Sequence, residues 1–373
     1  MKKIRWMTAA MCAALVMAGC GQQGTAPSTE TKEAATETAA DASADTETNQ
    51  DANADTTDAA ADNGQDEADG SDDGKKLADA NENETVETTE AEEGTGGHGT
   101  FTAPERKPLD EVSKIDEKNF LCTFDGVQHD FILELPEQCE NAPLIVMLHG
   151  YGMSAQAMKQ EVAMEEKALP RGYAVVYVTG ATDPTDPKSS NCWNSGVSAN
   201  TNDDVGLITA LVGYLQEEYG LSKERVYAAG FSNGGFMMHR LAMDAQDVFS
   251  AVVSEAGKMP NALWERRYEK NNVGVMQISG EKDELIPKNA DGSAKHAIDP
   301  AIEDVMDYWA ASNGLSGSTE SSIGKDSTIL KYEGDGKPVW SVVVKNGHHA
   351  WYDEKLTGID INGTILDFFD AAQ

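Results

Sequence analysis

Short runs of consecutive apolar residues recur along the chain from about residue 120 onward, each bounded by Gly, Pro, Asn or Asp. Uninterrupted runs of this length are typical of strands that are buried on both faces of a parallel sheet. The predicted buried strands are 144–148, 173–178, 226–229, 251–253, 275–278 and 340–344. Ahead of them, residues 120–124 and 129–135 flank an Asp125-Gly126 turn, which predicts an N-terminal hairpin.

Helical periodicity fills the gaps between these strands. One predicted helix has apolar residues at spacings of three and four, and Asp203 or Asp204 can cap it. A second helix is expected to open at Asp299-Pro300 and to stop at Asn313-Gly314. Strands that alternate with helices indicate βαβ units, so we expect an α/β domain whose mostly parallel central sheet is flanked by helices.

The N-terminus has the pattern of a targeting segment. Basic residues precede a short apolar stretch at 7–17, which is too short to span a bilayer and stay there. The stretch ends in Ala18-Gly19-Cys20 and resembles a bacterial lipobox, with Met17 where leucine is usual. We therefore predict a lipoprotein signal peptide at 1–19 and a lipid anchor on Cys20 that ties the protein to the membrane. The alternative is an ordinary secretory signal with an incidental cysteine, and either signal takes the protein out of the cytoplasm.

Residues 20–105 form a compositionally distinct segment. Residues 21–100 carry about 22 acidic against 3 basic side chains and no aromatic residue. Such a sequence cannot bury enough apolar surface to offset the entropy of ordering, so it predicts a disordered acidic linker. An alternative role is to gather cations or to bind a basic cell-wall component. Residues 106–373 are then the folded domain, and their length suits one sizeable core.

Charge and cysteine usage exclude several classes of partner and cofactor. The net charge of −35 argues against nucleic acid, because phosphate backbones need a basic face. The histidines and cysteines lack metal-ligand spacing and no dinucleotide fingerprint follows a strand, so we expect no metal and no cofactor. With Cys20 lipidated, Cys122, Cys139 and Cys192 allow at most one bridge, and we favour one that involves Cys139.

The sequence Gly230-Phe-Ser-Asn-Gly234 follows one predicted strand and precedes a helical pattern. The order strand, G-x-S-x-G, helix is the context of a nucleophile elbow, in which a tight turn presents a serine at a helix N-terminus. Ser232 is therefore the predicted nucleophile. A serine hydroxyl needs a base to take its proton and a carboxyl group to orient that base.

The two partners follow the serine in the order acid, then histidine, as on the α/β-hydrolase fold. Asp283 is the preferred acid because it lies on the loop after a predicted strand, ahead of the competitors Glu284 and, less favoured, Glu281. The base is His348 or His349, which follow the last strong apolar strand. The other histidines lie upstream of the serine, inside the helix after it, or on a polar connection.

Two backbone N–H groups are needed to hold the oxyanion of an acyl-transfer reaction. We assign them to Asn233, directly after the nucleophile, and to Tyr151 in the loop after the first parallel strand, with Gly152 as the next choice. His149 in that loop is expected to be structural. The long loop 179–199 is expected to contact the substrate through Trp193, and the alternative is that Trp193 packs the loop onto the domain.

These segments together resemble the extracellular polyhydroxybutyrate depolymerase-like esterases, which are similar to feruloyl and acetylxylan esterases. The matching pieces span from about residue 118 to the C-terminus and are 143–150, Cys192-Trp193-Asn194, 203–207, 226–238 and 347–351. The family's Gly-rich run, His, one residue, Trp pattern fits His349-Ala350-Trp351, which implies that His349 is the base. This chain departs from the pattern at His348 and at Tyr352-Asp353.

The combined prediction is an extracellular, surface-tethered serine esterase with the triad Ser232, Asp283 and His349, acting on a small or oligomeric ester. A serine peptidase would use the same triad. A non-catalytic surface-binding lipoprotein is the alternative from another class.

Overall fold

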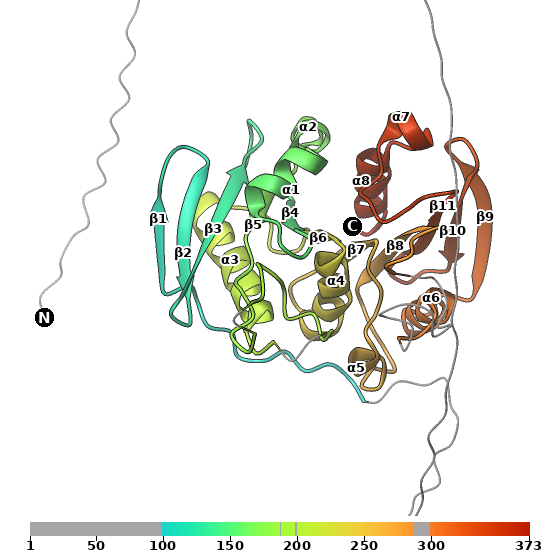
Figure 1. The fold of residues 1–373 in the computed structure, drawn as a ribbon, viewed down its shortest axis with the longest axis horizontal. Coiled ribbons are helices and arrows are strands. Elements are labelled where there is room, and N and C mark those ends of the chain that lie inside the picture. The colour runs from blue at the N-terminus through green and yellow to red at the C-terminus, as the bar shows by residue number, and fades with distance from the viewer. Residues whose placement is uncertain (1–98, 187, 198–199, 287–298) are drawn as a thin grey trace, which may run out of the picture. The chain divides into compact units, whose positions relative to one another are not determined.

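The computed structural model describes residues 99–186, 188–197, 200–286 and 299–373 (Figure 1). The predicted signal peptide, the predicted lipidation site Cys20 and nearly all of the predicted acidic linker lie outside these residues. Within the described ranges, no helix combines the length and the apolar content that a bilayer crossing requires.

The described strands form one eleven-stranded sheet in the order β1-β2-β3-β5-β4-β6-β7-β8-β11-β10-β9. Their bounds are β1 Glu111–Lys114, β2 Asn119–Phe124, β3 Val127–Glu134, β4 Leu144–Leu148, β5 Ala174–Val178, β6 Val226–Phe231, β7 Ala251–Glu255, β8 Gly274–Gly280, β9 Gly317–Ile323, β10 Ser327–Glu333 and β11 Val339–Val344.

The centre of the sheet is parallel and its edges are antiparallel. Strands β5, β4, β6, β7, β8 and β11 run in one direction, and every residue of β4 to β8 is buried. Burial on both faces explains why these strands are continuous apolar runs, and each was predicted. Strands β1, β9 and β10 were not predicted, because β1 and β9 are mostly exposed and polar and β10 is only partly buried.

Helices cover both faces of the sheet. Their bounds are α1 Ala155–Val162, α2 Met164–Ala168, α3 Asp204–Tyr219, α4 Asn233–Asp244, α5 Asn261–Trp264, α6 Ile302–Ser312, α7 Glu354–Thr357 and α8 Ile361–Ala371. Figure 1 shows α1, α2 and α8 on one side of the row of strands and α3, α4 and α6 on the other. Two core layers result, one that includes Leu211 and Trp309 and one that includes Met158 and Phe369. The predicted α/β architecture is therefore confirmed.

The two predicted helices differ in how they begin. Asp203 caps α3 by accepting the N–H of Gly206 at 2.9 Å, as expected for one of the two candidate caps. Helix α6 begins at Ile302 rather than at Asp299-Pro300. The Asp299 carboxyl accepts the N–H of Asn261 at 2.9 Å, so it ties the chain to α5 instead of capping α6. The predicted stop of α6 at Asn313-Gly314 is confirmed.

The expected bridge involving Cys139 is wrong for the part of the chain that the structure describes. Cys122, Cys139 and Cys192 are all free thiols. Cys122 lies in β2 with its side chain in the core, and burial raises the pKa of its thiol to about 12. A thiol with that pKa stays protonated and unreactive.

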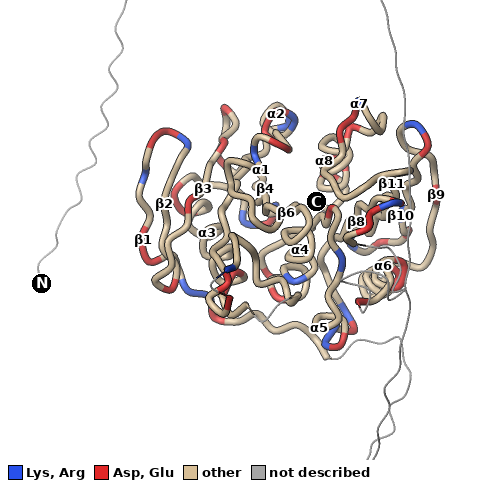
Figure 2. Tube along the Cα trace, in the orientation of Figure 1, with Lys and Arg blue, Asp and Glu red and all other residues tan. Residues whose placement is uncertain are grey.

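The carboxyl ends of the parallel strands bring several loops of the domain together. Figure 2 shows Lys, Arg, Asp and Glu residues on turns, helices and some strands around the domain. The loops after β4, β6, β8 and β11 begin at the carboxyl ends of parallel strands, which meet at one edge of the sheet. These four loops carry most of the residues that the sequence singled out for chemistry.

Candidate active site

Ser232 occupies a strained turn between β6 and α4. Its backbone has φ +53° and ψ −114°, an unusual conformation for a residue with a Cβ. Its N–H donates to the Glu255 carbonyl oxygen at 2.9 Å, which fixes the turn to the end of β7. The side chain of Ser232 is thereby presented at the N-terminal end of a helix, as the predicted elbow requires.

The glycines around Ser232 are required by close backbone contacts. A Cβ added at Gly230 would lie 2.3 Å from the Gly234 carbonyl oxygen, and one at Gly234 would lie 2.3 Å from the Leu148 carbonyl oxygen. Real Cβ atoms do not approach backbone oxygens this closely, so the strand, the turn and α4 would have to move apart.

Gly234→Ala is expected to lower the free energy of unfolding by about 3 kcal/mol, because the new methyl group overpacks a rigid backbone contact. Gly213→Ala in α3 is the matched control, since no atom lies within 4 Å of its Cβ position. The control is expected to gain up to about 1 kcal/mol from helix propensity. Urea unfolding of both variants measures the difference, and equal stabilities would contradict the steric argument.

Three side chains from separate loops meet beside this turn. Ser232 Oγ lies 2.9 Å from His349 Nε2, and His349 Nδ1 lies 2.8 Å from Asp283 Oδ2. A carboxyl oxygen facing Nδ1 sets the tautomer that carries a proton there, so that Nε2 accepts from the Ser232 hydroxyl. The structure thus brings the predicted nucleophile, base and acid together in one hydrogen-bonded chain.

Asp283 is held by its own loop. Its side chain is 2% exposed, and its Oδ1 accepts the backbone N–H groups of Leu285 and Ile286, each at 2.9 Å. Oδ2 is left to face the histidine. Of the two competing acids, Glu284 pairs with His348 at 3.1 Å and Glu281 pairs with Lys345 at 2.8 Å, and both pairs are exposed.

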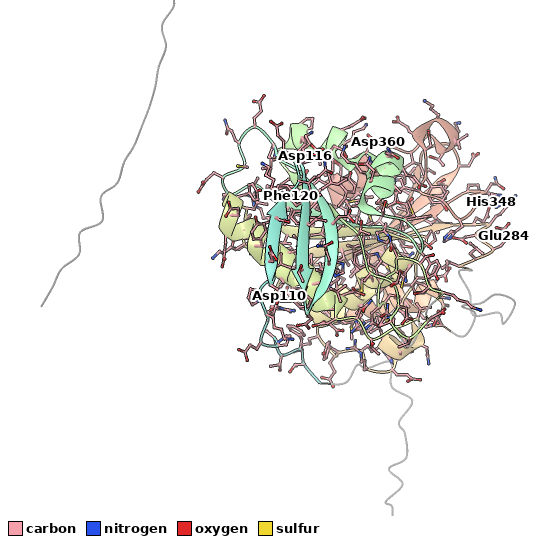
Figure 3. All side chains as sticks on the ribbon, turned by 60° about the vertical axis from the view of Figure 1, so that its left-hand side comes forward. Asp110, Asp116, Phe120, Glu284, His348 and Asp360 are labelled. Atoms are coloured by element: carbon pink, nitrogen blue, oxygen red, sulfur yellow. The ribbon has the colours of Figure 1, made fainter. Side chains whose placement is uncertain are left out.

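The two adjacent histidines point to different places. His348 is on the outer surface with Glu284, as Figure 3 shows, and 63% of its side chain is exposed. The side chain of His349 is 16% exposed, and its ring lies 5.2 Å from that of Phe231. The geometry therefore places His349, and not His348, beside Ser232.

The predicted oxyanion donors flank the same position. Asn233 is the first residue of α4, and its side-chain amide holds the backbone of Trp193 through bonds of 2.6 and 3.3 Å. The N–H of Gly152 already donates to the Asn191 carbonyl at 2.8 Å, which favours Tyr151 over Gly152 as the donor in the loop after β4. The Tyr151 hydroxyl accepts the N–H of Ser190 at 3.1 Å, which ties the two loops together.

His149 supports this loop from inside the protein. It is fully buried, its Nδ1 donates to the Gly150 carbonyl at 2.7 Å, and its Nε2 accepts the N–H of Gly180 at 2.9 Å. Burial lowers the pKa of His149 to about 4. His239 on α4 is also fully buried, between Gln277 and Trp309, and burial lowers its pKa to about 4.

His149 and His239 are expected to make the domain acid-sensitive. Between pH 6.5 and about 4 the unfolded chain binds protons at these positions and the native chain does not, so the free energy of unfolding falls as the pH falls. Each histidine contributes up to about 3 kcal/mol to this loss. Urea unfolding at pH 7 and pH 4.5 should show a smaller difference for His239→Gln than for the wild type. His348→Gln is the exposed control, and an unchanged difference in His239→Gln would contradict the assignment.

A cavity of about 450 Å³ opens beside Ser232 and His349. Six of the lining residues lie on the loop between β5 and α3, and three follow Asp283 in the chain. The lining residues are Tyr151, Asp183, Asp186, Ser189, Cys192, Trp193, Val197, Ser232, Asn233, Phe236, Glu284, Leu285, Ile286 and His349. Tyr151 and Leu285 are exposed apolar side chains at this cavity.

Trp193 borders the cavity but is only 1% exposed. Its indole N–H donates to the His149 carbonyl at 2.9 Å, and its ring lies 5.0 Å from that of His149. These contacts favour the packing alternative for Trp193, which anchors the loop to the domain. Within the described residues, no cluster of His, Cys, Asp and Glu could hold a metal ion.

Two acidic residues near the site were missed as contributors to it. Asp204, named only as an alternative cap, is buried and accepts the N–H of Asn194 at 2.6 Å, and burial raises its pKa to about 6. Glu255 is fully buried behind the elbow. The sequence signal for Glu255 was an acidic residue that ends an apolar strand, which alone does not distinguish a buried carboxyl from a solvated one.

Comparisons with known proteins agree on one class of enzyme. Residues 130–280 match the family model described as esterase PHB depolymerase. The chain is 32% identical over 167 residues to the provisionally named esterase NocK of Nocardia uniformis subsp. tsuyamanensis, covering 45% of this chain and 47% of that protein. It is 34% identical over 128 residues to feruloyl esterase B of Thermothelomyces thermophilus, covering 33% of this chain and 42% of that protein.

The chain thus spans less than half the length of these two relatives. Among solved structures, an acetyl xylan esterase from Aspergillus awamori is similar with a TM-score of 0.49 at 13% identity, over 65% of this chain and 94% of that one. The matched family segment contains Ser232, Tyr151 and Asn233 and ends before Asp283 and His349. The family match and the names of the relatives support the prediction of an ester-hydrolysing enzyme related to the esterase PHB depolymerase family.

Proposed function

We propose that this chain is an extracellular serine esterase that cleaves carboxylic esters through Ser232, His349 and Asp283. The observation that carries the proposal is the hydrogen-bonded chain of these three side chains, with contacts of 2.9 and 2.8 Å, at the wall of a cavity. That cavity has the size of a small-molecule site, which is typically about 300–1,000 Å³.

The proposed reaction has two acyl-transfer steps. Ser232 Oγ attacks the ester carbonyl carbon while His349 Nε2 takes the hydroxyl proton, and Asp283 stabilises the resulting imidazolium. The tetrahedral intermediate collapses, His349 protonates the leaving alkoxide, and an alcohol departs from the acyl-enzyme. A water molecule then repeats the sequence, which releases the carboxylic acid and restores the Ser232 hydroxyl.

The backbone N–H groups of Tyr151 and Asn233 are the proposed oxyanion donors. Asn233 begins α4, so its N–H adds to the positive end of that helix, which favours a developing negative charge. The loop that holds Tyr151 is fixed by His149 from inside and by Ser190 from outside. Donors that are fixed in advance need little reorganisation when the charge develops.

A substrate panel tests the proposal. The purified protein should hydrolyse p-nitrophenyl butyrate above the buffer rate, and feruloyl esters, acetylated xylan and short hydroxyalkanoate oligomers should then be ranked by kcat/KM. A fluorophosphonate probe should label Ser232. Cleavage of peptide amides in preference to esters would favour a peptidase, and absence of both hydrolysis and labelling would favour a non-catalytic binding protein.

We also propose that Cys20 carries the lipid that anchors the enzyme to the outer face of the membrane. The support is the signal-like sequence before Cys20 and the long acidic segment after it, which would space the domain from the surface. Metabolic labelling with a fatty acid should mark the wild type and not Cys20→Ser. Equal labelling of the two would contradict the anchor.

A further inference from the structure

Glu255 is a fully buried acidic residue that the proposed chemistry does not use. It is the last residue of β7 and is the register partner of Phe231, the residue before the nucleophile, on β6. Side chains of register partners on adjacent strands lie on the same face of a sheet. Glu255 and Phe231 therefore share a face, and the Phe231 ring packs near the His349 ring.

The main chain of Glu255 contacts the nucleophile turn directly. Its carbonyl oxygen accepts the N–H of Ser232 at 2.9 Å. Ala256, the next residue, has a φ of +50°, and a Cβ at Gly257 would lie 2.5 Å from the Gly235 carbonyl carbon. The backbone that carries Glu255 is therefore closely packed against the start of α4, and it cannot shift without moving Ser232.

The side chain of Glu255 contacts the histidine loop. Its Oε1 accepts the N–H of Tyr352 at 3.0 Å, and its Oε2 has no hydrogen-bond partner among the described residues. The Tyr352 hydroxyl in turn donates to the His348 carbonyl at 2.7 Å. Tyr352 therefore anchors the segment that contains His349, and the Glu255 carboxyl anchors the Tyr352 backbone.

The Glu255 carboxyl is fully buried and accepts the N–H of Tyr352. Burial raises its pKa well above the usual range, and the Glu161 carboxyl of α1 raises it further. Burial of this kind favours the uncharged form of a carboxyl group, and that form still accepts a hydrogen bond through its carbonyl oxygen. Glutamine has the same shape and the same acceptor, so it is the appropriate isostere.

We propose that Glu255 is a positioning residue that sets the distance between His349 and Ser232, acting as the acceptor for the Tyr352 N–H. One residue then connects both halves of the reacting pair, with its carbonyl on the serine turn and its carboxyl on the histidine loop. The proposal rests on the proposed esterase function. A misplacement of about 1 Å in such a pair can cost about 100-fold in rate.

Three variants test it. Glu255→Gln keeps the acceptor and should hold kcat within about threefold of the wild type. Glu255→Met keeps the length but removes the acceptor, and should lower kcat by about 30- to 100-fold with KM changed less than about twofold. Ser254→Ala is the control, because Ser254 is also fully buried on β7 but its hydroxyl has no partner among the described residues. It should match the wild type.

A proton NMR measurement gives a readout that does not need an ester. The downfield resonance of the His349 Nδ1 proton, which reports the contact with Asp283, should persist in Glu255→Gln and broaden or vanish in Glu255→Met. If the esterase proposal is wrong, a variant that lacks the Ser232 hydroxyl will hydrolyse the ester at the wild-type rate. The His349 resonance tests the role of Glu255 independently of that result.

Full kcat and an intact resonance in a folded Glu255→Met protein would overturn the inference. Loss of both in Glu255→Gln would also overturn it, because that variant keeps the acceptor. Should Glu255→Met fail to fold, Glu255→Gln decides alone. In that case, retained kcat and a retained resonance in Glu255→Gln support the inference, and loss of both contradicts it.

Discussion

Ser232→Ala is expected to lower kcat for p-nitrophenyl butyrate by about 10⁴-fold or more. The substitution removes the atom proposed to form the acyl-enzyme and leaves the cavity, the histidine and the proposed oxyanion donors in place. KM should change little, since the hydroxyl contributes more to the transition state than to substrate binding. Alanine also loses nothing in packing, because Ser232 is partly exposed.

Initial rates across a substrate series, with quantified protein, provide the measurement. Ser254→Ala is the matched control, because it removes a hydroxyl from a neighbouring strand without touching the cavity. Residual activity of the Ser232 variant should also resist fluorophosphonate. Hydrolysis by Ser232→Ala at the wild-type rate would end the proposal of a serine esterase.

His349→Ala is expected to lower kcat by a similar factor, whereas His348→Ala should stay within about threefold of the wild type. The two residues are adjacent in the sequence, but only the His349 ring reaches Ser232 and Asp283. His348 pairs with Glu284 at the surface, and an exposed pair of this kind contributes little. Both variants replace a histidine by alanine. A difference in kcat between them therefore reports where the ring lies and not which type of side chain is lost.

The double variant Ser232→Ala/His349→Ala adds a second check on His349. Residues that act as one unit lose function non-additively, so the double variant should be about as slow as either single variant. If the double variant loses kcat by the product of the two single-variant factors, the two residues act independently. A large loss in His348→Ala with activity kept in His349→Ala would exchange their proposed roles.

Local patterns were sufficient to predict the elbow and the central strands. Gly230, Ser232 and Gly234 form a contiguous motif whose steric demands are local, and strands buried on both faces carry uninterrupted apolar residues. The position of Asp283 followed from the order of elements along the chain. The edge strands β1 and β9 were missed because their residues are mainly exposed, so burial leaves no pattern in them.

Local patterns could not predict the contacts of Trp193, Asp204 and Glu255. Trp193 and Asp204 lie in recognisable segments, but their contacts cross between elements: the Trp193 indole reaches His149, 44 residues away, and Asp204 at the start of α3 accepts the N–H of Asn194 in the preceding loop. Glu255 ends an apolar strand, and only its burial and its hydrogen bond with the Tyr352 N–H show that it is a buried acceptor.

The sequence by itself determined the α/β architecture, and it predicted that Ser232, Asp283 and one of two adjacent histidines would meet, because both depend on short-range sterics and on where buried strands end. Only the tertiary structure decided which of two adjacent histidines faces the serine, which N–H in the loop after β4 is already occupied, and that Glu255 joins the two loops. Those outcomes depend on hydrogen bonds between separate segments of the chain, such as those that join Gly152 to Asn191, Ser232 to His349 (117 residues apart) and Glu255 to Tyr352 (97 residues apart). No local pattern encodes the relative position of two loops, since the packing of the whole sheet sets it.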